Sequence, residues 1–177
     1  VFGGRDQGYA PLGDTWEWNG TNWTRPVPGT EQSAMSAAVE TAAGEFVAVG
    51  GFQTVGGAQA QRVARHFAGT WRAMVPGQAF DDDVLQLFVE PGGGILAEGW
   101  FTRIGTLQAP GRARWDGATW QLLPPTPNPT SWLLVCGQLA NGEVVFQDGV
   151  SAPRFLAWNG MTWRVLAPTG VNGVVLN

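Results

Sequence analysis

This 177-residue chain has few residues of the types that commonly act in catalysis or bind metals, and they are far apart in the sequence. His66 is the single histidine, Cys136 the single cysteine and Tyr9 the single tyrosine. A histidine-based triad needs a nucleophile and an acid around the imidazole, and a zinc or copper site needs several nitrogen or sulfur ligands. The segment cannot assemble either site, so the sequence predicts no catalytic residue, no metal site and no cofactor.

Carboxylates are the remaining candidates for chemistry. The run Asp81-Asp82-Asp83 offers oxygen ligands for Ca²⁺, but it lacks the alternating spacing and the glycine of an EF-hand loop, and we interpret it as a solvated loop. Paired carboxylates for glycoside cleavage stay open because their separation is spatial. Convergence of Asp6, Asp14, Asp82 or Asp148 would favour such an enzyme.

Aromatic and arginine side chains in predicted loops are the candidates for ligand binding. Aromatic rings in loops stack on sugars or peptides, and arginines bind carboxylates through two hydrogen bonds. The alternative is that the loop aromatics fold back onto the protein. The candidate ligand-binding residues are Arg5, Tyr9, Phe52, Gln53, Trp100, Phe101 and Arg103.

Four copies of one motif organise the chain that must position these loops. Each copy has an aromatic residue, a turn that contains glycine and a closing tryptophan, at residues 18–23, 66–71, 115–120 and 158–163. The closing tryptophans lie 48, 49 and 43 residues apart, a period typical of solenoids, propellers and repeat arrays. We number the repeats 1 to 4, at about residues 1–30, 31–78, 79–127 and 128–170.

Each repeat divides into four short strand-like runs. In repeat 2 we predict strands at 34–39, 46–50, 63–67 and 71–75. In repeat 3 the predicted strands are 84–89, 95–99, 112–115 and 120–123. In repeat 4 they are 132–137, 144–146, 155–158 and 163–166. Asn-Gly and Asp-Gly in the last turns favour hairpins because these residues tolerate positive φ. A four-stranded unit of this length is typical of a propeller blade.

The predicted fold is therefore all-β, a β-propeller of four-stranded antiparallel blades with about four blades present. Residues 1–177 form a single propeller domain or a fragment of one, with 171–177 as an orphan first strand that either closes a four-blade ring or belongs to a larger ring. A plain β-sandwich is the alternative. Because repeat 1 begins in the register of a second strand, we expect the chain to be a piece of a longer polypeptide.

The packing of blades against one another also predicts which tryptophans are buried and at which end of the strands the long loops lie. Large flat side chains fill the space between blades, and the histidine in the motif of repeat 2 is interpreted as a core substitution. Arg65 and Arg114 are equivalent, so we expect a role in the repeat rather than in a ligand clamp. The tryptophans expected inside are Trp18, Trp23, Trp71, Trp115, Trp120, Trp158 and Trp163. The longer loops gather at one end of the strands, where recognition residues usually lie.

Composition excludes several classes of function. The chain has 26 Gly, 12 Pro and ten Trp, with 44% hydrophobic and 14% charged residues, which suits short strands joined by tight turns. Its positive charges are all arginine, and the formal charge is -4, so nucleic acid and anionic membrane are disfavoured as partners. No apolar run is long enough to insert into a membrane.

The repeats resemble known families. Val1-Phe2-Gly3-Gly4, followed by Trp16, Trp18 and Trp23, is similar to a bacterial kelch repeat. Repeats 2 and 3 resemble glycine-aromatic repeats of large bacterial surface propellers, and the turn at 116–120 resembles a shortened Asp-box of sialidase-type propellers. The resemblance implies a propeller in an extracytoplasmic bacterial protein, that is, periplasmic, cell-surface or secreted.

Fold alone does not select a function. We expect a non-catalytic binding or scaffolding module that recognises a protein or glycan partner through its long-loop end. Two alternatives stay open, a glycan-processing enzyme of the sialidase or glycosidase kind and a purely structural spacer of a large surface protein.

Overall fold

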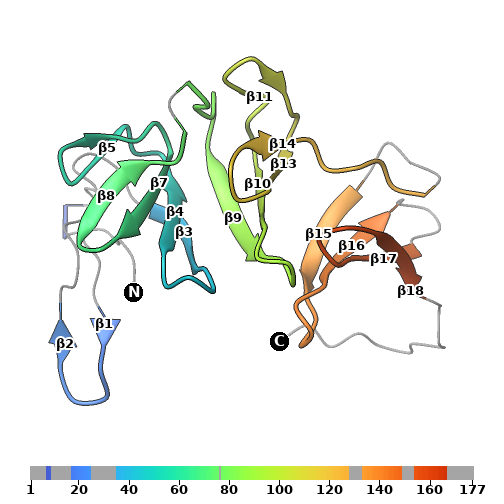
Figure 1. Cartoon of the computed structure of the whole chain (residues 1–177), viewed down its shortest axis with the longest axis horizontal. Coiled ribbons are helices and arrows are strands. Elements are labelled where there is room, and N and C mark those ends of the chain that lie inside the picture. The colour runs from blue at the N-terminus through green and yellow to red at the C-terminus, as the bar shows by residue number, and fades with distance from the viewer. Residues whose placement is uncertain are drawn as a thin grey trace. The chain divides into compact units, whose positions relative to one another are not determined.

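The computed structural model describes residues 7–8, 17–24, 35–75, 77–127, 133–148 and 154–166. The chain forms two compact units, which we describe separately. The first takes in Val1–Val89 and Gly93–Leu123, and the second takes in Glu90–Gly92 and Pro124–Asn177. Every regular element of the described residues is a β-strand, which confirms the all-β prediction (Figure 1). Within these ranges the structure contains no helix able to span a bilayer.

Two four-stranded antiparallel sheets lie in the first unit, one for each of repeats 2 and 3. The sheet of repeat 2 has the order β3-β4-β7-β8, with strands Met35–Glu40, Phe46–Gly50, Val63–Phe67 and Thr70–Ala73. The sheet of repeat 3 has the order β9-β10-β13-β14, with strands Val84–Val89, Ile95–Gly99, Arg112–Trp115 and Trp120–Gln121. All eight predicted strands are present, within two residues of their predicted bounds.

Repeat 4 supplies the sheet of the second unit. Its order is β15-β16-β17-β18, with strands Leu133–Gln138, Val144–Asp148, Arg154–Trp158 and Trp163–Leu166. Repeat 1 contributes the hairpin of β1 (Glu17–Trp18) and β2 (Trp23–Thr24) to the first unit. Among the described residues strand pairing stays within each repeat, and no closed ring is detected. The predicted orphan strand at 171–177 lies outside the described residues.

Two further hairpins were not predicted. They lie in the connections between the second and third strands, where the sequence predicted long loops. β5 (Thr54–Val55) pairs with β6 (Ala58–Gln59) in repeat 2, and β11 (Arg103–Ile104) pairs with β12 (Leu107–Gln108) in repeat 3. Strands of two residues show no alternation of apolar and polar side chains, so periodicity does not detect them.

A cross-strand aromatic pair closes the last hairpin of every repeat. The pairs are Trp18–Trp23, His66–Trp71, Trp115–Trp120 and Trp158–Trp163. Their ring centroids are 5.5, 5.1, 5.6 and 4.9 Å apart, the range of favourable aromatic contacts. The predicted motif is therefore a facing pair of rings on adjacent strands.

The first residue of the turn between the paired rings stabilises the turn through its side chain. In repeats 1, 3 and 4 this residue is Asn19, Asp116 or Asn159, and its Oδ1 accepts hydrogen bonds from the backbone N–H groups two and three residues later. The glycine that follows has φ between 93° and 103°. A short side-chain acceptor and a residue with no Cβ are what this turn requires.

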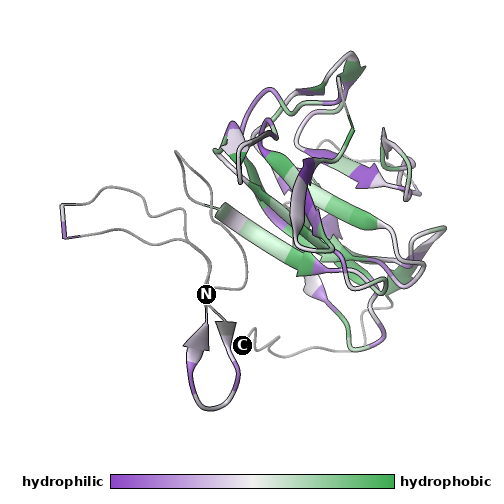
Figure 2. Cartoon of the chain, turned by 60° about the vertical axis from the view of Figure 1, so that its left-hand side comes forward, coloured by the Kyte–Doolittle hydropathy of each residue, from purple (hydrophilic) through white to green (hydrophobic). Residues whose placement is uncertain are grey.

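Apolar side chains fill two cores in the first unit. One core lies between the sheets of repeats 2 and 3 and includes Val47, Ile95, Trp115 and Trp120. The second covers the other face of the repeat 2 sheet and includes Trp71. Figure 2 shows apolar colour along the strands of these sheets and polar colour at several turns.

The prediction for the tryptophans holds in part. Trp71, Trp115, Trp120 and Trp158 are buried, and Trp163 is half-buried. Trp18 and Trp23 are 50% and 52% exposed, so the prediction of burial is wrong for them. Their hairpin has no neighbouring strand among the described residues, so no sheet covers their rings.

Gly99 gives a test of the repeat 3 sheet. A Cβ on Gly99 would lie 2.2 Å from the carbonyl oxygen of Asp83 and 2.8 Å from the Cα of Val84, and backbone atoms cannot turn aside as a side chain can. We expect Gly99→Ala to lower the free energy of unfolding by about 3 kcal/mol, measured by urea denaturation. Gly92→Ala is the control, because a Cβ there meets nothing within 4 Å. Equal stability of the two variants would contradict this prediction.

Candidate functional site

The connections at the long-loop end of repeats 2 and 3 are ordered and built alike. Arg62 N–H donates to the Phe52 carbonyl at 2.7 Å, and in repeat 3 Gly111 N–H donates to the Phe101 carbonyl at the same distance. Ala60 N–H and Ala109 N–H make a second matching pair of hydrogen bonds, to the residues after each phenylalanine. The same backbone is therefore made twice, and the two connections differ mainly in side chains.

Two of the predicted ligand-binding residues point inward. Phe52 is fully buried in the second core of the first unit, and Phe101 is 1% exposed and packs edge-on against Phe80 with centroids 4.7 Å apart. Val55 of the β5–β6 hairpin belongs to the same core as Phe52, and Ile104 of the β11–β12 hairpin belongs to the same core as Phe101. The two side chains therefore anchor the loops, as the fold-back alternative expected, and present no surface to a ligand.

Trp100 is a predicted ligand-binding residue that lies on the surface. It is 69% exposed, although its backbone is held by a hydrogen bond from its N–H to the Asp83 carbonyl at 2.9 Å. The equivalent residue in repeat 2 is Gly51, which shows that the backbone does not need an indole here. Gln53, another predicted residue of these loops, is also exposed.

Asp81 fixes the loop beside Trp100. Its Oδ1 accepts the backbone N–H groups of Thr102 and Arg103 at 2.8 and 2.9 Å, and its Oδ2 accepts the Thr102 hydroxyl at 2.7 Å. Arg103 Nε lies 3.6 Å from the same carboxylate, and the Arg103 side chain is more than half exposed. The backbone N–H of Arg103, followed by the Thr102 hydroxyl, holds the pKa of Asp81 well below its usual range.

The other two members of the acidic run also accept hydrogen bonds. Asp83 accepts from Arg62 Nε at 3.3 Å, and Arg62 Nη1 donates to the Phe80 carbonyl at 3.2 Å, which joins the connections of repeats 2 and 3. Asp82 Oδ1 accepts its neighbour's N–H at 2.7 Å. In the part of the chain that the structure describes, no group of acidic, histidine or cysteine side chains is arranged to hold a metal ion.

Of the carboxylates predicted for a glycosidase-like centre, the structure describes Asp82 in the first unit and Asp148 in the second. Arg5 and Tyr9, and the carboxylates Asp6 and Asp14, lie outside the described residues. Asp148 is buried and forms an ion pair with Arg154, whose Nε donates to it at 2.7 Å. Its carboxylate is therefore occupied in holding the repeat 4 sheet.

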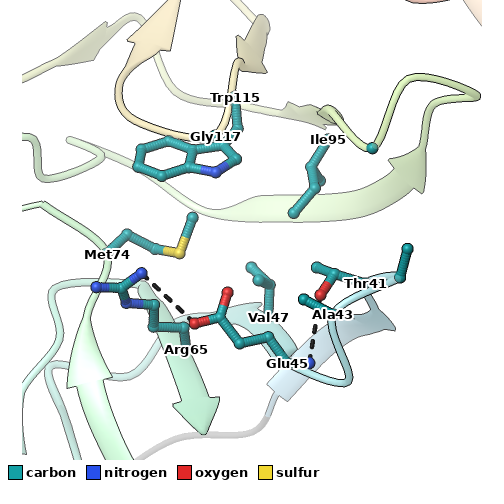
Figure 3. A pocket seen from close by; sticks show the side chains of 11 residues that line it. Thr41, Ala43, Glu45, Val47, Arg65, Met74, Ile95, Trp115 and Gly117 are labelled. Atoms are coloured by element: carbon teal, nitrogen blue, oxygen red, sulfur yellow. Dashed lines mark hydrogen bonds and ion pairs between the residues drawn. The ribbon is translucent and has the colours of Figure 1, made fainter.

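A cavity that the sequence did not predict lies at the opposite, tight-turn end of the first unit. It measures about 240 Å³ and opens between the turns of repeats 2 and 3 (Figure 3). Val47, Met74, Ile95 and the ring of Trp115 form apolar walls, and Glu45 and Arg65 line it with charge. These two side chains are 3.5 Å apart, a long ion pair.

Protonation of Asp81 gives a test of the loop. A carboxyl group whose folded pKa is lowered contributes stability above its unfolded pKa, and that contribution is lost as the pH falls toward the folded pKa. We expect Asp81→Asn to lower the melting temperature at pH 7 and the difference from wild type to shrink as the pH falls below about 4. Thermal unfolding followed by circular dichroism between pH 7 and pH 2 measures this, and a difference that stays constant over that range would contradict it.

In comparisons with known proteins, no family model, curated protein or solved structure matches the chain.

Proposed function

We propose that the chain is a non-catalytic recognition module of the β-propeller class, and that it binds its partner at the long-loop end beside Trp100. The repeated four-stranded antiparallel sheets support the propeller, since within the first unit the first strands β3 and β9 of successive repeats lie next to each other. In this proposal each sheet is a blade, either of a closed four-blade ring or of part of a larger one.

The observation that carries the binding proposal is an exposed indole on a fixed backbone. An aromatic side chain that is 69% exposed contributes little to folding, and the matching loop of repeat 2 has glycine in its place. Hydrogen bonds to Asp81 and Asp83 hold the chain on both sides of Trp100. Binding to it therefore costs little ordering of the loop.

The surroundings of Trp100 indicate the chemistry of the partner. The indole offers a flat apolar face, and Arg103, three residues later in the same loop, has a side chain that is more than half exposed. Together they suit a glycan that stacks a sugar ring on the indole and places hydroxyl or carboxylate oxygens near the arginine. A peptide with an aromatic or acidic side chain is the other ligand that these groups would accept.

Glycan and peptide arrays probed with wild type and Trp100→Ala test this function. We expect wild type to bind a subset of the glycans and Trp100→Ala to bind them about 30-fold more weakly, the loss typical of a central aromatic contact. Met161→Ala is the control, because Met161 is an exposed apolar side chain on a tight turn of the second unit. An array without binders, or equal binding by wild type and Trp100→Ala, would show the proposal to be wrong.

A further inference from the structure

The cavity at the tight-turn end of the first unit has a counterpart in the second unit that is filled. The comparison rests on the strand register, which pairs Trp115 with the first residue of β10 and Trp158 with the first residue of β16. By the same register Thr41 follows β3 as Glu90 follows β9. The two tryptophans are therefore equivalent, and so are Thr41 and Glu90.

In the second unit a carboxylate fills this position. Glu90 is 2% exposed, and Trp158 Nε1 donates to its Oε1 at 2.7 Å. Its Oε2 lies 3.2 Å from where a Cβ of Gly160 would be, so the carboxylate packs directly against the turn that follows the tryptophan. A buried indole N–H of this fold thus has a carboxylate as its acceptor.

In the first unit the position equivalent to Glu90 carries no carboxylate, and the one described carboxylate that lines the cavity, that of Glu45, is paired with Arg65. Thr41 is two heavy atoms shorter than glutamate, and its hydroxyl accepts the backbone N–H of Glu45 at 3.3 Å. Gly117, the equivalent of Gly160, has no atom within 4 Å of its Cβ position. Trp115 is 93% buried, and among the described residues its Nε1 meets no acceptor. Figure 3 shows the nitrogen edge of its ring turned toward the cavity.

Arg65 adds a positive charge to the same cavity. Its only ion-pair partner among the described residues is Glu45, at 3.5 Å, and its side chain keeps about a third of its surface exposed. The indole N–H of Trp115 faces the cavity without an acceptor among the described residues, and an arginine with one long ion pair has further donors to offer. Both groups are donors, and both favour an oxygen anion between them.

We propose that this cavity binds the carboxylate of a small ligand with a short apolar body. The carboxylate takes the position that the Glu90 side chain holds in the second unit, with Trp115 Nε1–H and Arg65 as donors, and the apolar body packs on Met74, Val47 and Ile95. A volume of about 240 Å³ lies below the range of roughly 300 to 1,000 Å³ for drug-sized ligands, so the ligand is small. Glu45 opposes a second negative charge, so a monocarboxylate is preferred.

Butyrate is the probe for this site. We expect the indole N–H resonance of Trp115, identified by its absence in Trp115→Phe, to shift saturably when sodium butyrate is added to the ¹⁵N-labelled chain. Sodium chloride at equal ionic strength should leave it in place, and butyramide should move it only at about tenfold higher concentration, because it lacks the charge. No shift with butyrate, or the same shift with chloride, would overturn the proposal.

Variants separate the donors from the shape of the cavity. Arg65→Gln should weaken butyrate binding by about tenfold or more, as loss of a charge-assisted hydrogen bond does. Thr41→Glu should move the Trp115 resonance to its butyrate-bound position without any ligand and abolish binding, whereas Thr41→Met should block binding without that movement. A Thr41→Glu variant that leaves the resonance unmoved and butyrate binding unchanged would show that the correspondence with Glu90 is wrong. Trp100→Ala should bind butyrate as wild type does, which keeps this test independent of the long-loop end.

Discussion

The facing aromatic pair at the last hairpin of each repeat is the interaction on which the rest of the structure depends. It pairs the third and fourth strands ring against ring, and it projects both rings from one face of the sheet. In repeat 3 that face packs against the repeat 2 sheet and forms the larger core of the first unit. In repeat 3 the two indoles are buried because the repeat 2 sheet covers that face, which links the motif to the stacking of these two sheets.

Repeats 2 and 3 share one backbone arrangement, so a comparison of equivalent positions separates the side chains that folding requires from those that can vary. Phe52 and Phe101 serve the same purpose at matching positions, since each pins a hairpin to a core. Gly51 and Trp100 occupy another matching pair, and only one of them carries a side chain. Thr41 and Glu90 are a third pair, in which a short side chain leaves a cavity that a long one would fill. The differences between equivalent positions therefore point to both candidate sites.

Much of the fold was predictable from residue pattern alone. The runs at 84–89 and 95–99 became β9 and β10 with the predicted bounds, because apolar residues flanked by glycine turns describe a strand wherever the chain places it. Asn19, Asp116 and Asn159 shape their turns through contacts within a few residues, and such local contacts are readable from sequence. The candidate site was less predictable, since the exposure of Trp100 and the burial of Phe101, its neighbour, depend on which way a loop folds.

The sequence by itself determined the repeat, the all-β class, the four-stranded units and the hairpin turns, because these follow from local spacing and backbone preference. Only the tertiary structure decided which loop aromatics are anchors and which one is exposed, and that Arg65 and Trp115 line a common cavity. Both facts depend on contacts between residues far apart in the chain. The position of a side chain at such a contact is set by the sheet that packs against it, and no spacing along one strand encodes it.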